Sequence, residues 1–442
     1  MRTRTILLIL LIFQFISSPS WAQGLPASTP DDVGLSTDRL HRLEQVIQQY
    51  VDSNAVAGAV TLIARKGRQA HVGTFGMADR DSNIPMNPNT IFRIASMTKP
   101  ITSVAVMMLY EEGHFKLNDP VGMYLPELAS LDVLTPSESG DGTFDRVPAK
   151  NPITIRHLLT HTSGIGYRFF GDLGATPKQR LIAELYGEAG VADGLAEHDG
   201  TIAELVTALG SLPLLHEPGA EFTYGLSDDV LGRFVEVISG QRFDEFLRTR
   251  LFEPLDMQDT QFYLPDSKAG RLAALYTPSQ TGGLTEVSGT AGGEHLTYSS
   301  TYTNGEQRTY FAGGAGLSST VYDYVRFLQM LLNGGILDDV RILSPTTIDL
   351  MTRNHIGNIP AGSVAPGSGG FGLGVAVTAD PGIDGELGSE GAYYWSGFFN
   401  TRFWVDPEED LIGIIMTQIF PSPSDIQEKF RIMAYQAIVE SH

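Results

Sequence analysis

The chain has 442 residues, of which 42% are hydrophobic and 9% aromatic, so it can bury a large core and is not a disordered segment. Its formal net charge of −21 argues against nucleic acid as a partner, because phosphate groups would be repelled. Cysteine is absent, which excludes disulfides, thiolate zinc sites, iron–sulfur clusters and cysteine nucleophiles.

The first 22 residues are predicted to be a secretory signal peptide. Two arginines precede an apolar run at residues 6–16, and the small residues Ser20 and Ala22 suit a cleavage site after Ala22. This run is too short to span a bilayer comfortably, so an uncleaved membrane anchor is the less favoured alternative. We therefore expect an exported protein, periplasmic or secreted, with no stable membrane anchor after cleavage.

The N-terminal part of the remaining chain predicts a helix, a hairpin and a second helix. An apolar stripe after a Ser or Thr cap predicts the first helix over residues 36–52. Strand-like runs at 57–64 and 70–75 flank basic and glycine residues, which is typical of a hairpin. The apolar run at 97–112 predicts a helix with Pro100 in its first turns, where a proline is tolerated.

The middle of the chain is predicted to be mostly helical, with long loops that shape a pocket. Helical periodicity is found at residues 202–209, 227–239, 243–252, 320–332 and 345–352. Polar, glycine-rich or irregular segments are expected to form the loops, at residues 131–152, 168–200 (with a helical second part) and 271–307.

The C-terminal part returns to strand-like patterns. These patterns lie at residues 371–378, 398–405 and 411–418, and a closing helix follows at 425–439. The sequence therefore predicts an α+β fold (an α/β sandwich), in which an antiparallel sheet from both termini is flanked by helices and an α-rich lobe is inserted. We expect a sheet lobe at about 23–95 and 310–442, and an α-rich lobe at about 96–309.

Ser96 and Lys99 form the first candidate for chemistry. In a helix that begins near residue 97 they lie three residues apart on one face. A serine hydroxyl becomes nucleophilic when a base takes its proton, and a lysine amine serves when burial or nearby positive charge lowers its pKa. An S-x-x-K pattern alone is common, and a helix cap followed by a solvated lysine is the simpler interpretation of it.

The surrounding motifs are more specific than this pair. The chain reads FRIASMTKP at 92–100, ITIRHLLTHTSG at 153–164, YGLSDDVLG at 224–232, GGAGLSST at 313–320 and WSG at 395–397. In this order and combination it resembles the serine β-lactamase-like superfamily, which contains class C β-lactamases, DD-peptidases and family VIII carboxylesterases. The resemblance extends over about residues 35–440 and implies the β-lactamase/transpeptidase-like fold.

The same resemblance implies roles for individual residues. Ser96 would be the acylated nucleophile, Lys99 would share or accept its proton, and Tyr224 would be the partner general base and acid. The backbone N–H groups of Ser96 and Phe398 would form the oxyanion hole. The substrate-binding residues would be Leu226, Trp395, Ser396 and Gly397. No cofactor or metal is expected.

Two departures from the family pattern predict the substrate class. Leu226 stands where the Y-x-N element has its asparagine, and Trp395 stands where the K-T-G element has its lysine. An amide and a cation that recognise β-lactams and peptidyl-D-alanine are thereby missing, and Trp395 offers an apolar face instead. We expect hydrolysis of small, neutral or aromatic esters, with weak or no β-lactamase activity.

Other interpretations stay open or rank lower. A β-lactamase or D-alanyl peptidase is one alternative, and an inactive homologue that binds cell-wall peptides or a protein partner is another. His157 and His161 have the spacing of a zinc-protease helix, but Leu158 stands where that chemistry needs glutamate. Ser227 is interpreted as a helix N-cap. The sequence leaves the natural substrate, the acyl chain length and the oligomeric state open.

Overall fold

The structure is a computed structural model that describes residues 24–305, 307–361 and 369–440. The predicted signal peptide at residues 1–22 lies outside these residues. Within the described ranges, no helix is both long and apolar enough to cross a bilayer.

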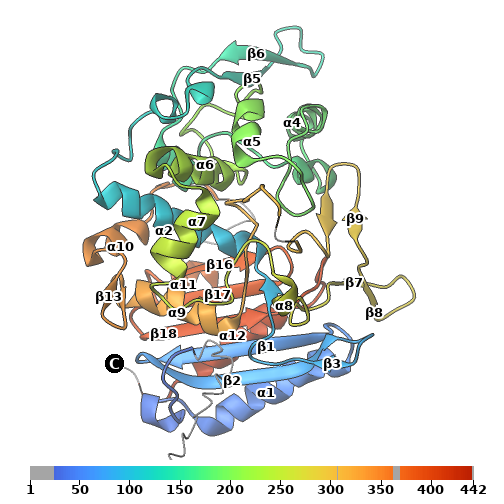
Figure 1. The fold of residues 1–442 in the computed structure, drawn as a ribbon, viewed down its shortest axis with the longest axis vertical. Coiled ribbons are helices and arrows are strands. Elements are labelled where there is room, and N and C mark those ends of the chain that lie inside the picture. The colour runs from blue at the N-terminus through green and yellow to red at the C-terminus, as the bar shows by residue number, and fades with distance from the viewer. Residues whose placement is uncertain (1–23, 306, 362–368, 441–442) are drawn as a thin grey trace, which may run out of the picture.

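A single eight-stranded antiparallel sheet forms the centre of the molecule (Figure 1). Its strands are, in spatial order, β14 (Gly370–Phe371), β15 (Ala376–Val377), β16 (Tyr393–Gly397), β17 (Thr401–Asp406), β18 (Leu411–Met416), β1 (Gly58–Arg65), β2 (Arg68–Asp79) and β3 (Ile84–Pro85). The N-terminal hairpin joins the C-terminal strands through β1 and β18, where Leu62 pairs with Ile414. The predicted sheet built from both termini is therefore confirmed.

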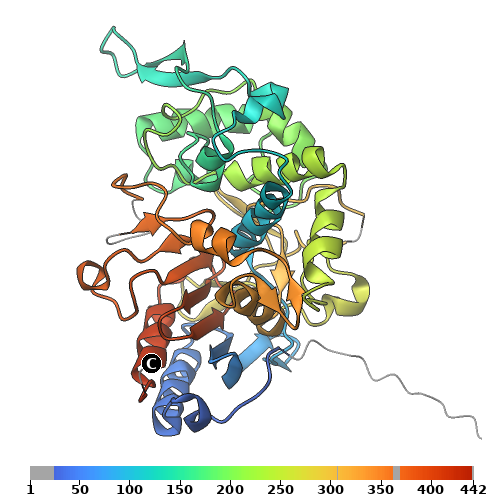
Figure 2. The ribbon, with the colours of Figure 1, turned by 90° about the vertical axis from the view of Figure 1, so that its left-hand side faces the viewer.

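Helices cover both faces of this sheet. The longer helices are α1 (Thr37–Asp52), α2 (Thr98–Glu111), α4 (Pro177–Glu188), α5 (Ile202–Leu209), α6 (Ser227–Ser239), α9 (Val321–Leu332), α10 (Pro345–Met351) and α12 (Ile426–Gln436). α1 and α12 lie side by side against one face, around the fully buried Trp404 (Figure 2). α9 packs on the opposite face, and both β17 and β18 are buried along their whole length. Such a doubly covered sheet explains why these strands are continuously apolar.

The helical part above the sheet is built around α2 and α6, which pack on each other (Figure 1). Its shorter helices are α3 (Ile155–Leu159), α7 (Phe243–Leu247) and α8 (Asp266–Ala269). A further short helix, α11 (Pro381–Asp384), lies in the chain between the sheet strands β15 and β16. The small strand pairs are β4 (Phe92–Arg93) with β11 (Ser318–Ser319), β5 (Asp132–Pro136) with β6 (Phe144–Pro148), β7 (Tyr276–Pro278) with β8 (Leu284–Glu286), β9 (Thr290–Gly292) with β10 (Thr297–Ser299), and β12 (Ile336–Leu337) with β13 (Val340–Arg341). The α+β prediction with a mostly helical insertion is confirmed, while the lobe boundaries stay predictions.

Several sequence-based expectations were wrong in detail. The loop expected at 271–307 contains the β7–β8 and β9–β10 pairs, and the strand expected at 398–405 begins only at Thr401. The loop expected at 131–152 contains the β5–β6 hairpin. The helix expected at 243–252 is α7 followed by one π-helical turn at Arg248–Phe252. The strand expected at 371–378 is split into β14 and β15, because Gly374 adopts a left-handed φ of 88° in the turn between them.

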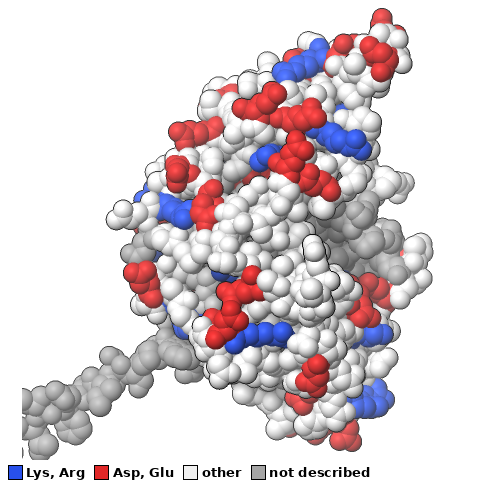
Figure 3. All heavy atoms as spheres, turned by 90° about the vertical axis from the view of Figure 1, so that its right-hand side faces the viewer, with Lys and Arg blue, Asp and Glu red and all other residues white. Residues whose placement is uncertain are grey.

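Charged side chains are dispersed over the surface. On the face shown in Figure 3, acidic and basic residues are interspersed among broad uncharged areas. The described residues on that face form no continuous basic stripe. The excess of acid in the sequence is therefore distributed and not gathered at one place on this face.

Candidate active site

Ser96 lies in a tight turn at the entrance of α2. The 3₁₀ turn Ala95–Met97 follows β4 directly and leads into the helix. Ala95 is fully buried with a positive φ of 42°, a conformation that costs a non-glycine residue energy and persists only when its surroundings enforce it. This turn places Ser96, which is half-buried, at the N-terminal end of α2.

Lys99 is fully buried and reaches back to this serine. Its Nζ atom lies 3.3 Å from Ser96 Oγ, 2.9 Å from the Tyr167 hydroxyl and 2.7 Å from the Gly314 carbonyl oxygen. Three partners hold the amine in one position, so the structure brings the predicted pair together. An amine held within reach of a hydroxyl satisfies the geometry required of a base for a serine nucleophile.

Tyr224 faces the same amine from the segment before α6. Lys99 Nζ lies 4.6 Å from the centre of its ring, and the ring lies 5.5 Å from that of Trp395. The Tyr224 hydroxyl is buried and has no hydrogen-bond partner among the described residues. The phenol is thus in the predicted crevice with its oxygen uncommitted, and its role as general base stays a prediction.

Tyr167 is a site residue that the sequence reasoning missed. Its hydroxyl accepts a hydrogen bond from Lys99, and its ring stacks on Phe169 at 4.5 Å. Burial above all, and then the neighbouring Tyr224, raise the pKa of its phenol well above the ordinary value, so the hydroxyl stays protonated at neutral pH. It follows the HTSG segment by three residues, which was the available signal in the sequence.

β16 forms the opposite wall, and its last residue explains how it approaches the nucleophile. A Cβ atom on Gly397 would lie 2.4 Å from the Ile94 carbonyl oxygen, just before the turn that carries Ser96. Only glycine permits this close approach, which places Phe398 beside Ser96 on the pocket wall. Trp395 is only 3% exposed and packs on Phe371 at 5.3 Å.

These groups line a pocket of about 260 Å³. It contains Ser96, Tyr224, Trp395, Ser396, Gly397 and Phe398 of the predicted set, together with Tyr167, Phe169, Phe170, Leu173, Asp193, Leu195 and Ala315. The pocket is therefore mostly aromatic and aliphatic, which suits an uncharged substrate.

Two sequence-based expectations near Tyr224 are corrected by the structure. Leu226 is fully buried in the core and is not among the residues that line the pocket, so its side chain does not reach substrate there. Ser227 is not the N-cap of α6, because it is the first residue of that helix and its hydroxyl bonds to Ser163 at 2.9 Å. Leu226 occupies the cap position and makes no side-chain capping bond.

The two histidines serve the fold around the site. His157 completes a capping box with Thr154 at the start of α3. His161 is fully buried, its ring lies 4.8 Å from that of Tyr224, and its Nε2 atom lies 3.2 Å from Asp228 Oδ2. Over the described part of the chain, no three His, Asp or Glu side chains are grouped so that they could hold a metal ion.

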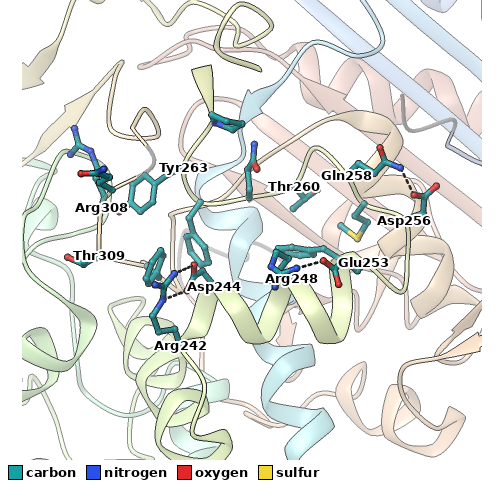
Figure 4. Close-up of a pocket in the computed structure, with 17 residues that line it drawn as sticks. Arg242, Asp244, Arg248, Glu253, Asp256, Gln258, Thr260, Tyr263, Arg308 and Thr309 are labelled. Atoms are coloured by element: carbon teal, nitrogen blue, oxygen red, sulfur yellow. Dashed lines mark hydrogen bonds and ion pairs between the residues drawn. The ribbon is translucent and has the colours of Figure 1, made fainter. Parts of the chain in front are cut away.

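A larger hollow of about 770 Å³ lies elsewhere, between α7 and the segments near residues 260 and 309 (Figure 4). It contains none of the predicted catalytic or substrate-binding residues. The charges of Arg242 and Arg248 are paired there with Asp244 and Glu253. The predicted catalytic residues instead lie at the smaller pocket, which Ser96, Tyr167 and Tyr224 line, with the buried Lys99 amine next to Ser96.

Comparisons with known proteins agree with this geometry. A family model described as Beta-lactamase matches residues 43–437. Protein Rv1367c of Mycobacterium tuberculosis is 34% identical over 387 residues, which are 86% of this chain and 90% of that protein. Esterase EstB of Burkholderia gladioli is 30% identical over 403 residues, which are 89% of this chain and 94% of that protein.

A solved structure supports the same relationship. It is described as EstCE1, a hydrolase with promiscuous acyltransferase activity, and it is 28% identical in sequence with a TM-score of 0.76. The match covers 91% of this chain and 99% of that chain. The resemblance inferred from the motifs is thereby confirmed.

Proposed function

The chain belongs to the beta-lactamase family and is a serine hydrolase, and from that premise we propose that it cleaves carboxylic esters through an acyl-enzyme on Ser96. The observation that carries the proposal is the Lys99 amine, which is fully buried and lies 3.3 Å from Ser96 Oγ, while Ser96 itself lines a mostly apolar pocket. Esterase relatives favour the ester over other acyl substrates.

The proposed acylation step uses groups that lie at the pocket or, for Lys99, next to Ser96. Lys99 accepts the proton of Ser96, and Oγ attacks the ester carbonyl carbon. The carbonyl oxygen becomes an oxyanion that the N–H groups of Ser96 and Phe398 stabilise. Collapse breaks the bond to the alkoxy group, which takes a proton from Tyr224, while Lys99 returns the serine proton to the phenolate. The products are an alcohol and the acyl-enzyme.

Deacylation follows the same path in reverse. Lys99 first takes the proton of Tyr224, and the resulting phenolate accepts a proton from a water molecule whose oxygen attacks the acyl carbon. The tetrahedral intermediate then releases Ser96 Oγ, which takes a proton from the charged Lys99 amine. The carboxylic acid leaves, and each group regains its starting proton.

Weak or absent β-lactamase activity is part of the proposal. By the resemblance of its motif, Trp395 stands where β-lactamases and DD-peptidases carry a cation for the substrate carboxylate, and it lines the pocket. An anionic β-lactam would meet aromatic walls without a charged partner in this place, which disfavours its binding. The alternative is β-lactamase or D-alanyl peptidase activity. Comparing the turnover of esters with that of β-lactams and D-alanyl peptides distinguishes the two.

The experiment is a substrate panel on the purified protein. We expect turnover of p-nitrophenyl acetate and butyrate and little of nitrocefin, and a fluorophosphonate label on Ser96. Ser96→Ala should lose turnover and label, while Ser396→Ala, an exposed serine in the same pocket, should keep the label. Wild-type turnover no faster than that of Ser96→Ala would contradict the proposal and favour a binding role.

Acyl transfer is a second candidate activity. The aromatic and aliphatic lining of the pocket favours an alcohol over water as acceptor of the acyl group, and acyltransferases are among the relatives. Adding a primary alcohol to the p-nitrophenyl butyrate reaction should yield the new butyrate ester. Free butyrate as the sole product at high alcohol concentration would rule transfer out.

Export completes the proposal. We propose cleavage after Ala22, so that the mature chain begins at Gln23. Its support is the order of basic, apolar and small residues at 1–22 and the packing of the chain shortly afterwards, where Leu25 is buried and Arg326 bonds to the Gly24 carbonyl. N-terminal sequencing of exported protein tests it, and an intact Met1 there would refute cleavage.

A further inference from the structure

Asp229 is a buried acid beside the active site that the steps above do not use. It is the third residue of α6 and its side chain is fully buried. Neither carboxylate oxygen has a hydrogen-bond partner of ordinary geometry among the described residues. Burying such a group without good partners costs folding free energy, so its presence calls for a functional reason.

The peptide of Gly314 connects this acid to the catalytic amine. A Cβ atom on Gly314 would lie 2.7 Å from Asp229 Oδ2, 2.7 Å from the Tyr167 hydroxyl and 3.4 Å from Lys99 Nζ. Lys99 also donates a hydrogen bond to the Gly314 carbonyl. The acid, the phenol and the amine therefore surround Gly314. Any residue larger than glycine at this position would collide with them.

The acid and the amine interact electrostatically across this glycine. Burial, above all, raises the pKa of the Asp229 carboxyl to about 7, while Lys99 and the Gly314 N–H oppose the rise. The other titratable groups that face it are Asp228, Asp193, Tyr167 and Tyr310. His161 contacts the neighbouring Asp228, with its Nε2 atom 3.2 Å from Asp228 Oδ2. Among these groups Lys99 is the only base that affects the Asp229 carboxyl.

We propose that Asp229 is a positioning residue whose carboxylate stabilises the positive charge that Lys99 acquires when it takes the proton of Ser96. The inference rests on the proposed function. Both groups lie within 4 Å of the Cβ position of Gly314, and inside a protein opposite charges that flank one residue interact strongly because little water screens them. Asp229 does not line the substrate pocket, so its effect should fall on kcat and not on KM.

Asp229→Asn tests the proposal, because it removes the charge and keeps the size of the side chain. With p-nitrophenyl butyrate we expect kcat at pH 8 to fall by roughly 10- to 100-fold, on the scale of other lost electrostatic contributions, and KM to change less than about twofold. Near pH 6, where the wild-type carboxyl holds a proton, the two enzymes should become similar. The wild-type rise in kcat around pH 7 should disappear in the variant.

Thermal stability supplies a readout that a merely structural role would not give. The folded protein binds the Asp229 proton more tightly than the unfolded chain, whose carboxyl has a pKa near 3.8. Ionisation therefore destabilises the fold as pH rises from about 4 through about 7. Asp229→Asn should have a higher Tm than wild type at pH 8 and a similar one at pH 5. A structural acid would give a lower Tm.

Asp323→Asn is the matched control. Asp323 is also fully buried with its pKa raised to about 7, but it lies on α9 and bonds to Thr260. Its replacement should leave kcat and the pH profile unchanged. Should Asp229→Asn fail to fold, Asp229→Ser removes the same charge with a smaller side chain.

The proposal is overturned if a folded Asp229 variant keeps wild-type kcat and the wild-type rise around pH 7. It is equally overturned if Asp323→Asn loses activity in the same way. Failure of the proposed function has a different signature, since wild type would then show no turnover that depends on Ser96.

Discussion

At the scale of single residues, the two phenols near Lys99 differ in what their oxygens do. The Tyr167 hydroxyl accepts a hydrogen bond from the amine at 2.9 Å, whereas the Tyr224 hydroxyl has no partner among the described residues. A buried hydroxyl left without a partner adds nothing to stability, but it is available to substrate. The structure therefore distinguishes a phenol that anchors the amine from one whose oxygen is uncommitted, which is what the proposed role of Tyr224 requires.

This difference predicts opposite effects of removing each hydroxyl. Tyr224→Phe should lower kcat by roughly 10²–10⁴, the usual effect of a lost general acid or base, and leave stability unchanged or slightly higher. Tyr167→Phe should lower stability by about 1–3 kcal/mol, because a hydrogen bond to the amine is lost. Ester turnover and urea unfolding of both variants check this. Equal kinetic effects, or a stability loss confined to Tyr224→Phe, would contradict the assignment.

The sequence identified those residues of the site that motifs carry. Ser96, Lys99 and Tyr224 are separated by up to 128 positions, yet each stands in a recognisable segment and all three reach one crevice. Tyr167 and Asp229 were not identified, because no local pattern specifies the contacts at Gly314 that bring them near Lys99. Leu226 was misplaced because its position in the motif says nothing of the direction of its side chain.

At the scale of secondary structure, the approach of β16 to the serine turn depends on Gly397. A Cβ atom there would lie 2.4 Å from the Ile94 carbonyl oxygen and 2.2 Å from Thr401 Oγ1. Gly397→Ala should push the strand away from the turn, widen the oxyanion hole and lower kcat, at a cost of about 1–3 kcal/mol in stability. Ester turnover and thermal unfolding measure both effects.

Gly270→Ala is the control for this change, since its Cβ atom would meet nothing within 4 Å and its φ is ordinary. It should keep wild-type kcat and Tm. If Gly397→Ala behaves like this control, the strand does not position the oxyanion hole.

The sequence predicted helices and strands correctly where the local pattern was strong. It failed where pairing with distant parts of the chain determines the secondary structure. Ser36 caps α1 as its sequence indicates, and α6 spans the 13 residues of its apolar pattern. β16 was recognised only through its WSG motif. Its first three residues, Tyr–Tyr–Trp, are all aromatic and do not show the alternation of apolar and polar residues that indicates a strand. The β5–β6 hairpin was taken for a loop, since both strands are short and β6 is largely exposed.

At the scale of the whole molecule, Arg65 joins both ends of the described chain to the sheet. It lies at the end of β1, and its side chain is fully buried. Its guanidinium donates to the carbonyls of Val33, Gly34, Glu409 and Glu440, and to the Glu409 carboxylate at 2.9 Å. All five N–H donors of the group are thereby used.

Replacing this arginine should destabilise the whole fold while sparing the chemistry. Arg65→Met should lower the free energy of unfolding by about 3 kcal/mol, because several buried carbonyls lose their donor together. Arg353→Ala, which breaks an exposed pair with Asp349, should cost less than about 1 kcal/mol. Urea unfolding measures both, and kcat of folded Arg65→Met should equal wild type because Arg65 does not line the substrate pocket. An unfolding midpoint shared by Arg65→Met and Arg353→Ala would show that the chain ends are held by apolar packing around Trp404 and not by this guanidinium.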